Sequence, residues 1–247
     1  NMEKKTKNEK MRVAKLISNS GFSSRRDAEK LIIEKRVKLN GKTIESPAIN
    51  IDKNSIIEID GKIIETNIRT QVWIFNKPRG CLVTKKDPQE RATIYNFLPK
   101  QLQNIKTIGR LDYNSEGLLM LTNDGDFSRY IELPKNNFKR IYKVRVFGKI
   151  NEKRLHNLSN GIKINGENFK PLDVIVEKRQ KSNSWLNFTL YEGRNREIRK
   201  ICKYMDLEVS RLIRYSYGPF NLGNLNKCGI KKVPHSFLIR KLPKFFK

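Results

Sequence analysis

One aspartate between two predicted strands stands where it could do chemistry. Asp112 lies in the stretch Gly-Arg-Leu-Asp-Tyr-Asn-Ser-Glu-Gly of residues 109–117, after the predicted strand Thr107–Ile108 and before the apolar run Gly117–Thr122. The adjacent Arg110 favours an ionised carboxylate, because an opposite charge stabilises the charged form. Such a carboxylate can act as a nucleophile or as a base. On spacing alone, a hydrogen-bonded turn aspartate is the simpler interpretation.

A second segment concentrates positive charge. Residues 191–200 read Tyr-Glu-Gly-Arg-Asn-Arg-Glu-Ile-Arg-Lys, so that a predicted strand ends at Gly193 and a helix follows over Asn195–Tyr204. On that helix Arg196, Arg199 and Lys200 share one face, an arrangement that suits a groove for phosphates. A solvated charged face, the alternative, would mix the two signs more evenly.

A third segment places an aromatic ring among basic residues. The alternating pattern of Arg140–Phe147 predicts a strand, and Tyr142 lies between Arg140 and Lys143. A tyrosine in this setting can stack on a nucleic-acid base. A core tyrosine in a sheet is the common alternative.

Near the N-terminus, a predicted helix over Arg25–Lys35 begins with two serines and two arginines. Ser23 or Ser24 can cap this helix. Positive charge in a first helical turn opposes the helix dipole, whereas a phosphate is favoured at a helix N-terminus. The two arginines therefore favour a bound phosphate over a capped helix with solvated side chains. A strand around Lys38 and an Asn40-Gly41 turn follow.

The overall charge points to the same class of partner. The 247 residues include 52 Lys and Arg against 25 Asp and Glu, a formal net charge of +27. Such a surface repels itself unless it meets a polyanion, and nucleic acid is the default partner. The abundance of Lys, Asn and Ile is also what an A/T-rich genome produces, but this bias does not explain clustered arginines. The sequence lacks an apolar run of membrane-spanning length and begins with charged residues, so we expect a cytoplasmic protein that does not contact a membrane.

The residues that usually hold metals or cofactors are scarce. Cys81, Cys202 and Cys228 are far apart, and His156 and His235 are the only histidines. These spacings favour neither a disulfide framework nor a zinc site, and glycine-rich nucleotide-binding motifs do not occur. We therefore expect no metal and no cofactor, with buried thiols in a reducing compartment and any catalysis resting on carboxylates, arginines and tyrosines.

The elements that would position these residues predict an α+β chain. Residues 1–10 read as a disordered basic tail, 11–65 as a small module of two helices and short strands, 66–70 as a linker and 71–247 as a catalytic domain with a mixed, mainly antiparallel sheet. The strands expected in this domain are Val72–Phe75, Cys81–Thr84, Thr107–Ile108, Gly117–Thr122, Arg140–Phe147, Val174–Glu177, Trp185–Tyr191 and Glu208–Arg214. The expected helices are Thr93–Leu98, Phe127–Leu133, Glu152–Leu158 and Asn195–Tyr204.

Two parts of the sequence resemble known protein families. Residues from about Met11 to Asp60 resemble the alpha-L RNA-binding domain that a small-subunit ribosomal protein and tyrosyl-tRNA synthetases share. The string from Gly109 to Asp126 closely resembles the signature of the RsuA/RluB family of ribosomal RNA pseudouridine synthases. The likeness to this family extends to the start of the catalytic domain at residues 76–80 and to the segments at 140–144, 191–200 and 209–218. It weakens after Leu225.

The resemblance implies a set of site residues. It places the catalytic aspartate on Asp112 and the base-contacting tyrosine on Tyr142. It also implies an arginine paired with Asp112, for which Arg194 is the first choice and Arg199 the second, and an apolar residue near the uracil at Ile198. Together with the basic segments above, the expected substrate contacts are Arg110, Ile198, Arg196, Arg199, Lys200, Ser24, Arg25, Arg26 and Lys38.

The function implied is isomerisation of one uridine in ribosomal RNA. For the oligomeric state, which the sequence does not indicate, a monomer is the simplest expectation. The likeness favours a stem-loop of the large-subunit (23S) RNA over the small-subunit (16S) RNA. A non-catalytic RNA-binding assembly factor would fit the charge and the N-terminal module equally well, but it would not require Asp112, Tyr142 and Arg194 together. A ribonuclease would call for paired histidines or a metal-binding carboxylate cluster.

Overall fold

The structure is a computed structural model that describes residues 10–52, 55–66, 69–180 and 182–246. These residues fall into two compact units. The first comprises the described residues within Asn1–Gln71, Pro99–Lys106 and Thr122–Gly125, and the second comprises Val72–Leu98, Thr107–Leu121 and Asp126–Lys247. Of the predicted tail, residues 1–9 lie outside the described part of the chain, as do positions 67–68 of the predicted linker.

The first unit contains the N-terminal module of two helices and short strands. Helices α1 (Val13–Asn19) and α2 (Arg25–Ile33) pack on a sheet in the order β3-β2-β5-β6, formed by Lys42–Thr43, Val37–Leu39, Ile57–Ile59 and Lys62–Ile64. Its core consists of aliphatic side chains such as Ile17, Ile32 and Ile57. Ser24 caps α2, because its Oγ accepts a hydrogen bond from Asp27 N at 3.2 Å. Of the two serines predicted as alternatives for the cap, Ser24 takes this role.

The second unit is built on a mixed sheet. Its strands run in the order β13-β14-β10-β15-β9-β7-β17, with β16 paired to β15 and β8 paired to β9. These strands are Asp173–Arg179, Asn183–Leu190, Arg140–Phe147, Glu208–Tyr217, Glu116–Thr122, Val72–Lys77, Ile230–Lys232, Phe220–Asn221 and Lys106–Ile108. The β15–β9 pair is parallel, whereas β10–β14, β10–β15, β13–β14 and β17–β7 are antiparallel. The predicted mixed, mainly antiparallel sheet is confirmed.

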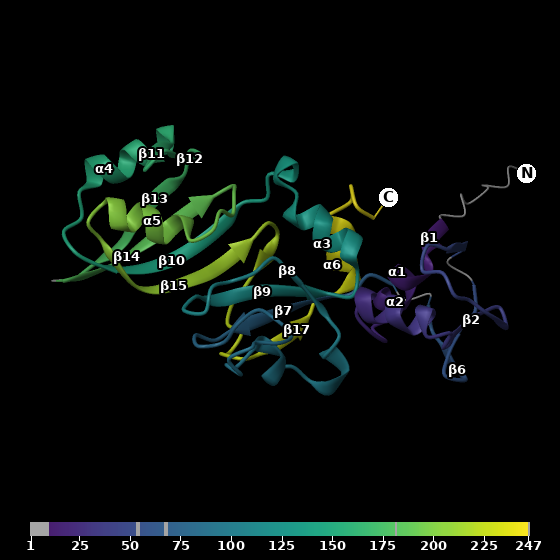
Figure 1. Cartoon of the computed structure of the whole chain (residues 1–247). Helices are drawn as coiled ribbons and strands as arrows, with labels where there is room; N and C mark the ends of the chain where they lie inside the picture. Colours follow the sequence, from purple (N-terminus) through teal and green to yellow (C-terminus); the bar gives the residue numbers. More distant parts are fainter. Residues whose placement is uncertain (1–9, 53–54, 67–68, 181, 247) are drawn as a thin grey trace, which may run out of the picture. The chain divides into compact units, whose positions relative to one another are not determined.

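Two separate cores stabilise the two ends of this sheet. One end packs β10 and β14 against α4 (Glu152–Asn157) and α5 (Glu197–Tyr204), through residues that include Val144, Phe188 and Ile201. The other packs β7 and β9 against α3 (Gly125–Glu132) and α6 (His235–Lys241). Figure 1 shows α4 and α5 beside β10, β13 and β14, away from α3 and α6. The parallel β9–β15 pair joins the two ends.

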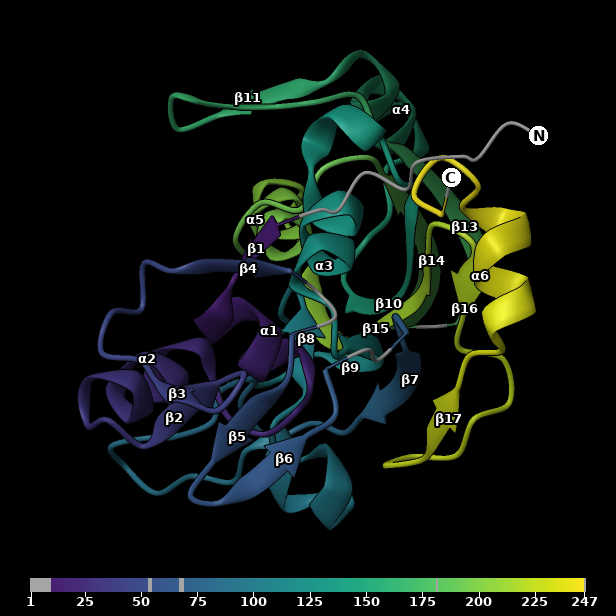
Figure 2. The same cartoon turned by 90° about the vertical axis from the view of Figure 1, so that its right-hand side faces the viewer.

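Several predicted elements differ from the structure. The module predicted from residue 11 has its first helix at Val13, because Lys10–Arg12 form strand β1 against β4 (Asn50–Asp52). Residues 81–84 are not a strand and contribute an isolated bridge from Leu82 to Thr93. The helix predicted over Thr93–Leu98 is a single 3-10 turn, Ile94–Asn96. The hairpin β11 (Ile162–Ile164) and β12 (Glu167–Phe169), which Figure 2 shows beside α4, was not predicted, nor were β16, β17 and α6.

Candidate active site

Asp112 occupies a tight turn between β8 and β9. Ser115 N donates to Asp112 O at 3.0 Å and closes the turn, and the Asp112 side chain is 35% exposed. Gly117 follows with φ +98°, and a Cβ there would lie 2.4 Å from the carbonyl oxygen of Arg214. Only glycine permits this close approach of β9 to β15. The turn is thereby fixed at the point where the two halves of the sheet meet.

A buried lysine donates hydrogen bonds to the backbone of the same turn. Lys77, at the end of β7, is fully buried, and its Nζ donates to Asp112 O at 3.1 Å and to Ser115 O at 2.9 Å. A third bond reaches Pro78 O at 3.0 Å. Burial lowers the pKa of Lys77, while Cys81, Asp112 and Glu116 oppose that shift. The ammonium therefore organises backbone carbonyls around the candidate catalytic residue.

The arginine turn, residues 192–196 between β14 and α5, faces Asp112. Arg196 adopts the left-handed conformation with φ +54°, so α5 begins at Glu197 rather than at the predicted Asn195. Arg196 Nη1 lies 3.8 Å from Asp112 Oδ2. In the next turn Arg199 Nη2 donates to Asn114 O at 3.2 Å. Two arginines thus reach the Asp112 turn from α5 and its cap.

Arg199 is the more enclosed of these two arginines. Its Nε is buried and has no hydrogen-bond partner among the described residues. Burial lowers the pKa of Arg199, the charge of Arg196 adds to this effect, and the charge of Asp112 opposes it. An unsatisfied buried donor is costly. An additional hydrogen-bond acceptor at Nε would therefore stabilise this guanidinium.

The expected pairing of Arg194 with Asp112 differs from the structure. Arg194 Nε donates to Glu192 Oε2 at 3.2 Å, and its Nη1 lies 3.6 Å from Glu167 Oε1. Arg194 therefore contacts the β11–β12 hairpin, through Glu167 and the ring of Phe169. Lys200 joins it there, 2.7 Å from Glu167 Oε2. The arginine at the aspartate is Arg196, with Arg199 close by.

Tyr142 and Ile198 lie on the side of the sheet that α5 covers. Tyr142 on β10 pairs with Arg214 on β15, which in turn pairs with Gly117 on β9. Two strand spacings of about 4.8 Å therefore separate the backbones of Tyr142 and Gly117. Tyr142 is partly buried against the core cluster that contains Ile198. Arg110, by contrast, is exposed on the turn before Asp112.

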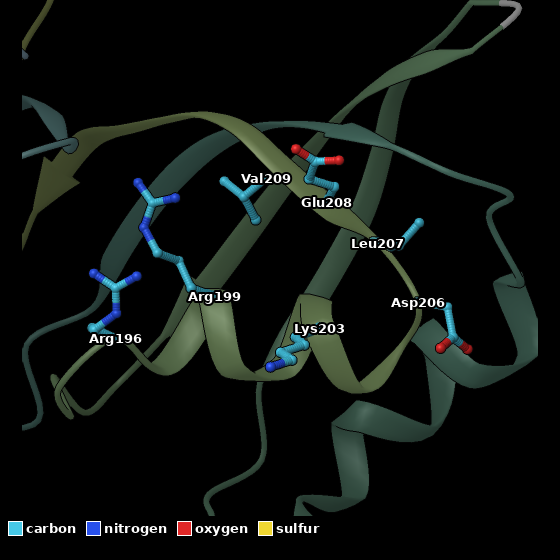
Figure 3. Close-up of a pocket in the computed structure, with 7 residues that line it drawn as sticks. All are labelled: Arg196, Arg199, Lys203, Asp206, Leu207, Glu208 and Val209. Atoms are coloured by element: carbon cyan, nitrogen blue, oxygen red, sulfur yellow. The ribbon is translucent and has the colours of Figure 1, made fainter.

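A shallow groove continues from the two arginines along α5. It has a volume of about 390 Å³ and is lined by Arg196, Arg199, Lys203, Asp206, Leu207, Glu208 and Val209. Figure 3 shows Arg196 and Arg199 side by side at the start of α5, with Lys203 one turn further on. Positive side chains at this spacing form a track that suits a phosphate backbone.

The predicted contacts of the N-terminal module lie on its surface. Arg25 and Arg26 are exposed at the start of α2, and Arg25 Nε lies 3.5 Å from Glu29 Oε1. Lys38 forms an ion pair of 3.1 Å with Glu58. Exposed pairs of this kind are weak, so phosphates can compete for these side chains.

Known proteins share both units of the chain. A family model described as RNA pseudouridylate synthase matches residues 71–204, and an S4 domain model matches residues 11–57. The chain belongs to the RNA pseudouridine synthase family. A protein of Rickettsia felis named "Uncharacterized RNA pseudouridine synthase" is 46% identical over 227 residues, which cover 92% of this chain and 98% of that protein.

Further relatives of this synthase carry more specific names. A Buchnera aphidicola protein named "Ribosomal large subunit pseudouridine synthase B" is 38% identical and covers 88% of this chain and 90% of that protein. A crystal structure of a pseudouridylate synthase superposes with a TM-score of 0.65 at 28% identity, covering 94% of this chain and 99% of the other. The synthase is thus an isomerase that acts on RNA, as the sequence predicted.

Other features of the synthase complete the description. Within the described residues, no His, Cys, Asp and Glu cluster could hold a metal ion, and no helix is long and apolar enough to cross a bilayer. Burial raises the pKa of the Cys202 thiol to about 12.

Four residues that shape the site were not predicted from the sequence: Lys77, Glu167, Glu192 and Glu197.

Proposed function

We propose that this synthase isomerises one uridine in a stem-loop of large-subunit ribosomal RNA, with Asp112 as the catalytic residue. The observation that carries the proposal is the Asp112 turn, whose backbone is bonded to a buried lysine and whose carboxylate faces Arg196 where the groove along α5 begins. The relatives named as large-subunit synthases favour that RNA as the substrate. A ribosomal substrate would also place the enzyme in the bacterial cytoplasm.

The chemistry proposed for this site is a rearrangement within the nucleotide. The bond from uracil N1 to ribose C1′ breaks, the base rotates, and a bond from C5 to C1′ forms. C5 then loses its proton and N1 gains one, so the product is an isomer and the balance needs no cofactor. Asp112 starts the reaction either by attack on the sugar or by removal of a ribose proton. Arg196, 3.8 Å from the carboxylate, and Arg199, bonded to Asn114 O in the same turn, orient Asp112.

Access to the uridine requires that the base leaves its stack. Unstacking costs a few kcal/mol, and stacking on Tyr142 with packing on Ile198 would offset this cost. The groove along α5 would hold the neighbouring phosphates. The S4 module would add further contacts through Ser24, Arg25, Arg26 and Lys38, and it would recognise the shape of the RNA rather than the base itself.

Tritium release from uridine labelled at C5 tests the substrate assignment. Transcripts of large-subunit and small-subunit RNA are incubated separately with the enzyme, and the released label is counted. We expect release from the large-subunit RNA at one equivalent per molecule and none from the small-subunit RNA. Release from the small-subunit RNA alone would reassign the substrate. Tight binding without release from either RNA would favour a non-catalytic assembly factor.

A further inference from the structure

Glu197 is a buried carboxyl group directly after the arginine turn. As the first residue of α5 it follows Arg196, and it is 4% exposed. Its Oε2 accepts the backbone N–H of Arg194 at 3.2 Å. Its Oε1 is buried without a hydrogen-bond donor among the described residues. One oxygen therefore fixes the turn, while the other has no partner that an ionised carboxylate could use.

The neighbour of Glu197 is a second carboxyl group. Glu192 accepts the backbone N–H of Lys170 at 2.9 Å and Arg194 Nε at 3.2 Å, so both of its oxygens already have donors. Two ionised carboxylates side by side repel each other, and one of them is then forced to hold a proton. A protonated Glu197 can donate a hydrogen bond to Glu192, which an ionised Glu197 cannot.

Other charged groups around the turn do not neutralise Glu197. The Arg194 guanidinium is shared between Glu192 and Glu167, and Lys200 on α5 pairs with Glu167 of the β11–β12 hairpin. Arg140 on β10 lies against Gly193 and donates to Tyr217 Oη at 2.6 Å. Burial, with Glu192 adding to it and Arg194 opposing it, raises the pKa of Glu197 to about 7.

We propose that Glu197 is a positioning residue that carries a proton in the assembled site and, hydrogen-bonded to Glu192, holds the turn that presents Arg196 to Asp112. Ionisation of Glu197 breaks this bond, loosens the turn and weakens the Arg196–Asp112 contact. This role rests on the proposed function of Asp112. It makes the arginine side of the site sensitive to pH near neutrality.

Nuclear magnetic resonance of the full chain tests this proposal without reference to turnover. The ¹³C resonance of the Glu197 carboxyl group is assigned by its loss in Glu197→Gln and followed from pH 4 to pH 9, together with the ¹⁵Nε resonance of Arg196. We expect both signals to change with a common midpoint near 7. A Glu197 midpoint below 5, or an Arg196 signal that ignores the Glu197 titration, overturns the proposal. The enzyme need not be active for this result.

Single-turnover tritium release across pH 5.5–8.5 is the second arm. Glu197→Gln keeps an acceptor and a donor, so its rate should be independent of pH where the wild-type rate falls above pH 7. Glu197→Ala lacks both and should lose up to about threefold in rate with little change in RNA affinity, because the loss cannot exceed that expected when the exposed Arg196 contact is removed. Glu177→Gln, an exposed carboxyl on β13, is the matched control and should follow the wild type.

The outcomes separate the two proposals. A Glu197→Gln profile that falls with pH as the wild type does, or a Glu197→Ala rate equal to that of the wild type, contradicts the positioning role. An absence of release by the wild type contradicts the proposed function, and the resonance titration then decides the role of Glu197 alone. Melting curves of each variant show whether a lost rate reflects a lost fold.

Discussion

The two sides of the site are held in place by different means. The Asp112 turn rests on a fully buried ammonium, Lys77, which bonds to backbone carbonyls. The arginine turn is also bonded to a buried carboxyl group, Glu197, but its charged side chains form exposed contacts: the ion pairs of Arg194 and Lys200 with Glu167 are 35–43% exposed. Buried bonds to the backbone keep one geometry, whereas exposed ion pairs exchange readily. This contrast indicates a fixed aspartate and an arginine side that RNA phosphates can rearrange.

The largest effect is expected when the buried support is removed. Lys77→Met keeps the side-chain volume but leaves buried carbonyls without a donor, at a cost of roughly 1–3 kcal/mol for each group. The Asp112 turn should shift, and a displacement of about 1 Å can cost about 100-fold in rate. Single-turnover tritium release and thermal melting measure both effects. Lys178→Met, exposed on β13, is the control, and equal behaviour of the two variants would contradict this account.

Among the arginines at the Asp112 turn, the effect of a substitution should increase with the burial of the guanidinium. Arg199→Gln removes a half-enclosed guanidinium and should lower the rate by about tenfold or more, in line with a charge-assisted hydrogen bond. Arg196→Gln, with a 55% exposed side chain, should cost roughly threefold. Arg194→Gln should act on RNA affinity rather than on rate. A larger rate loss in Arg194→Gln than in Arg199→Gln would reverse the assignment, and exposed Arg240→Gln serves as the control.

The carboxyl pair should also affect stability. The pKa of Glu197 is raised to about 7 in the folded protein from 4.5, so the folded state binds more protons than the unfolded state between these values. Stability should therefore fall as pH rises from about 4.5 to about 7. Glu197→Gln should gain at least ~1 kcal/mol relative to the wild type at pH 8 compared with pH 4, or roughly 2–4 °C in Tm. A Tm difference that does not depend on pH would contradict this linkage.

The smallest effects should come from the S4 module. Arg25→Ala and Arg26→Ala remove exposed charges, so each should weaken RNA binding a few-fold and lower the slope of log affinity against log salt by about 1. The single-turnover rate at saturating enzyme should not change. Fluorescence anisotropy at several salt concentrations measures this, with Lys30→Ala on the same helix as the comparison. A changed rate at saturation would mean that the module does more than bind.

The regular elements could be predicted from local pattern. The alternation of Arg140–Phe147 gave the bounds of β10, and the apolar run at Gly117–Thr122 marked the buried strand β9. The Asn165-Gly166 turn is typical of a hairpin and indicates the β11–β12 hairpin, which was not predicted. The strand predicted at residues 81–84 was wrong. Cys81 is buried in a loop, and a short apolar run without alternation does not distinguish a buried loop from a strand.

The contacts of the site could be predicted only in part. The residues that meet at Asp112 lie in separate segments. Arg196 takes the left-handed conformation, and Arg194 pairs with Glu192 and Glu167; sequence spacing reports neither the backbone angle nor these partners. The buried Lys77 had a visible signal, a lysine that ends the apolar strand Val72–Lys77. Its partners are backbone carbonyls, which no residue pattern reveals.

Asp112→Asn tests the central claim most directly. This change keeps the shape of the side chain and removes its charge, so the RNA should bind with an affinity within about threefold of the wild type. Single-turnover tritium release from the bound large-subunit RNA should fall below detection, while Asp173→Asn on β13 should match the wild type. This result would identify Asp112 as the reacting group. Release by Asp112→Asn at the wild-type rate would contradict the account.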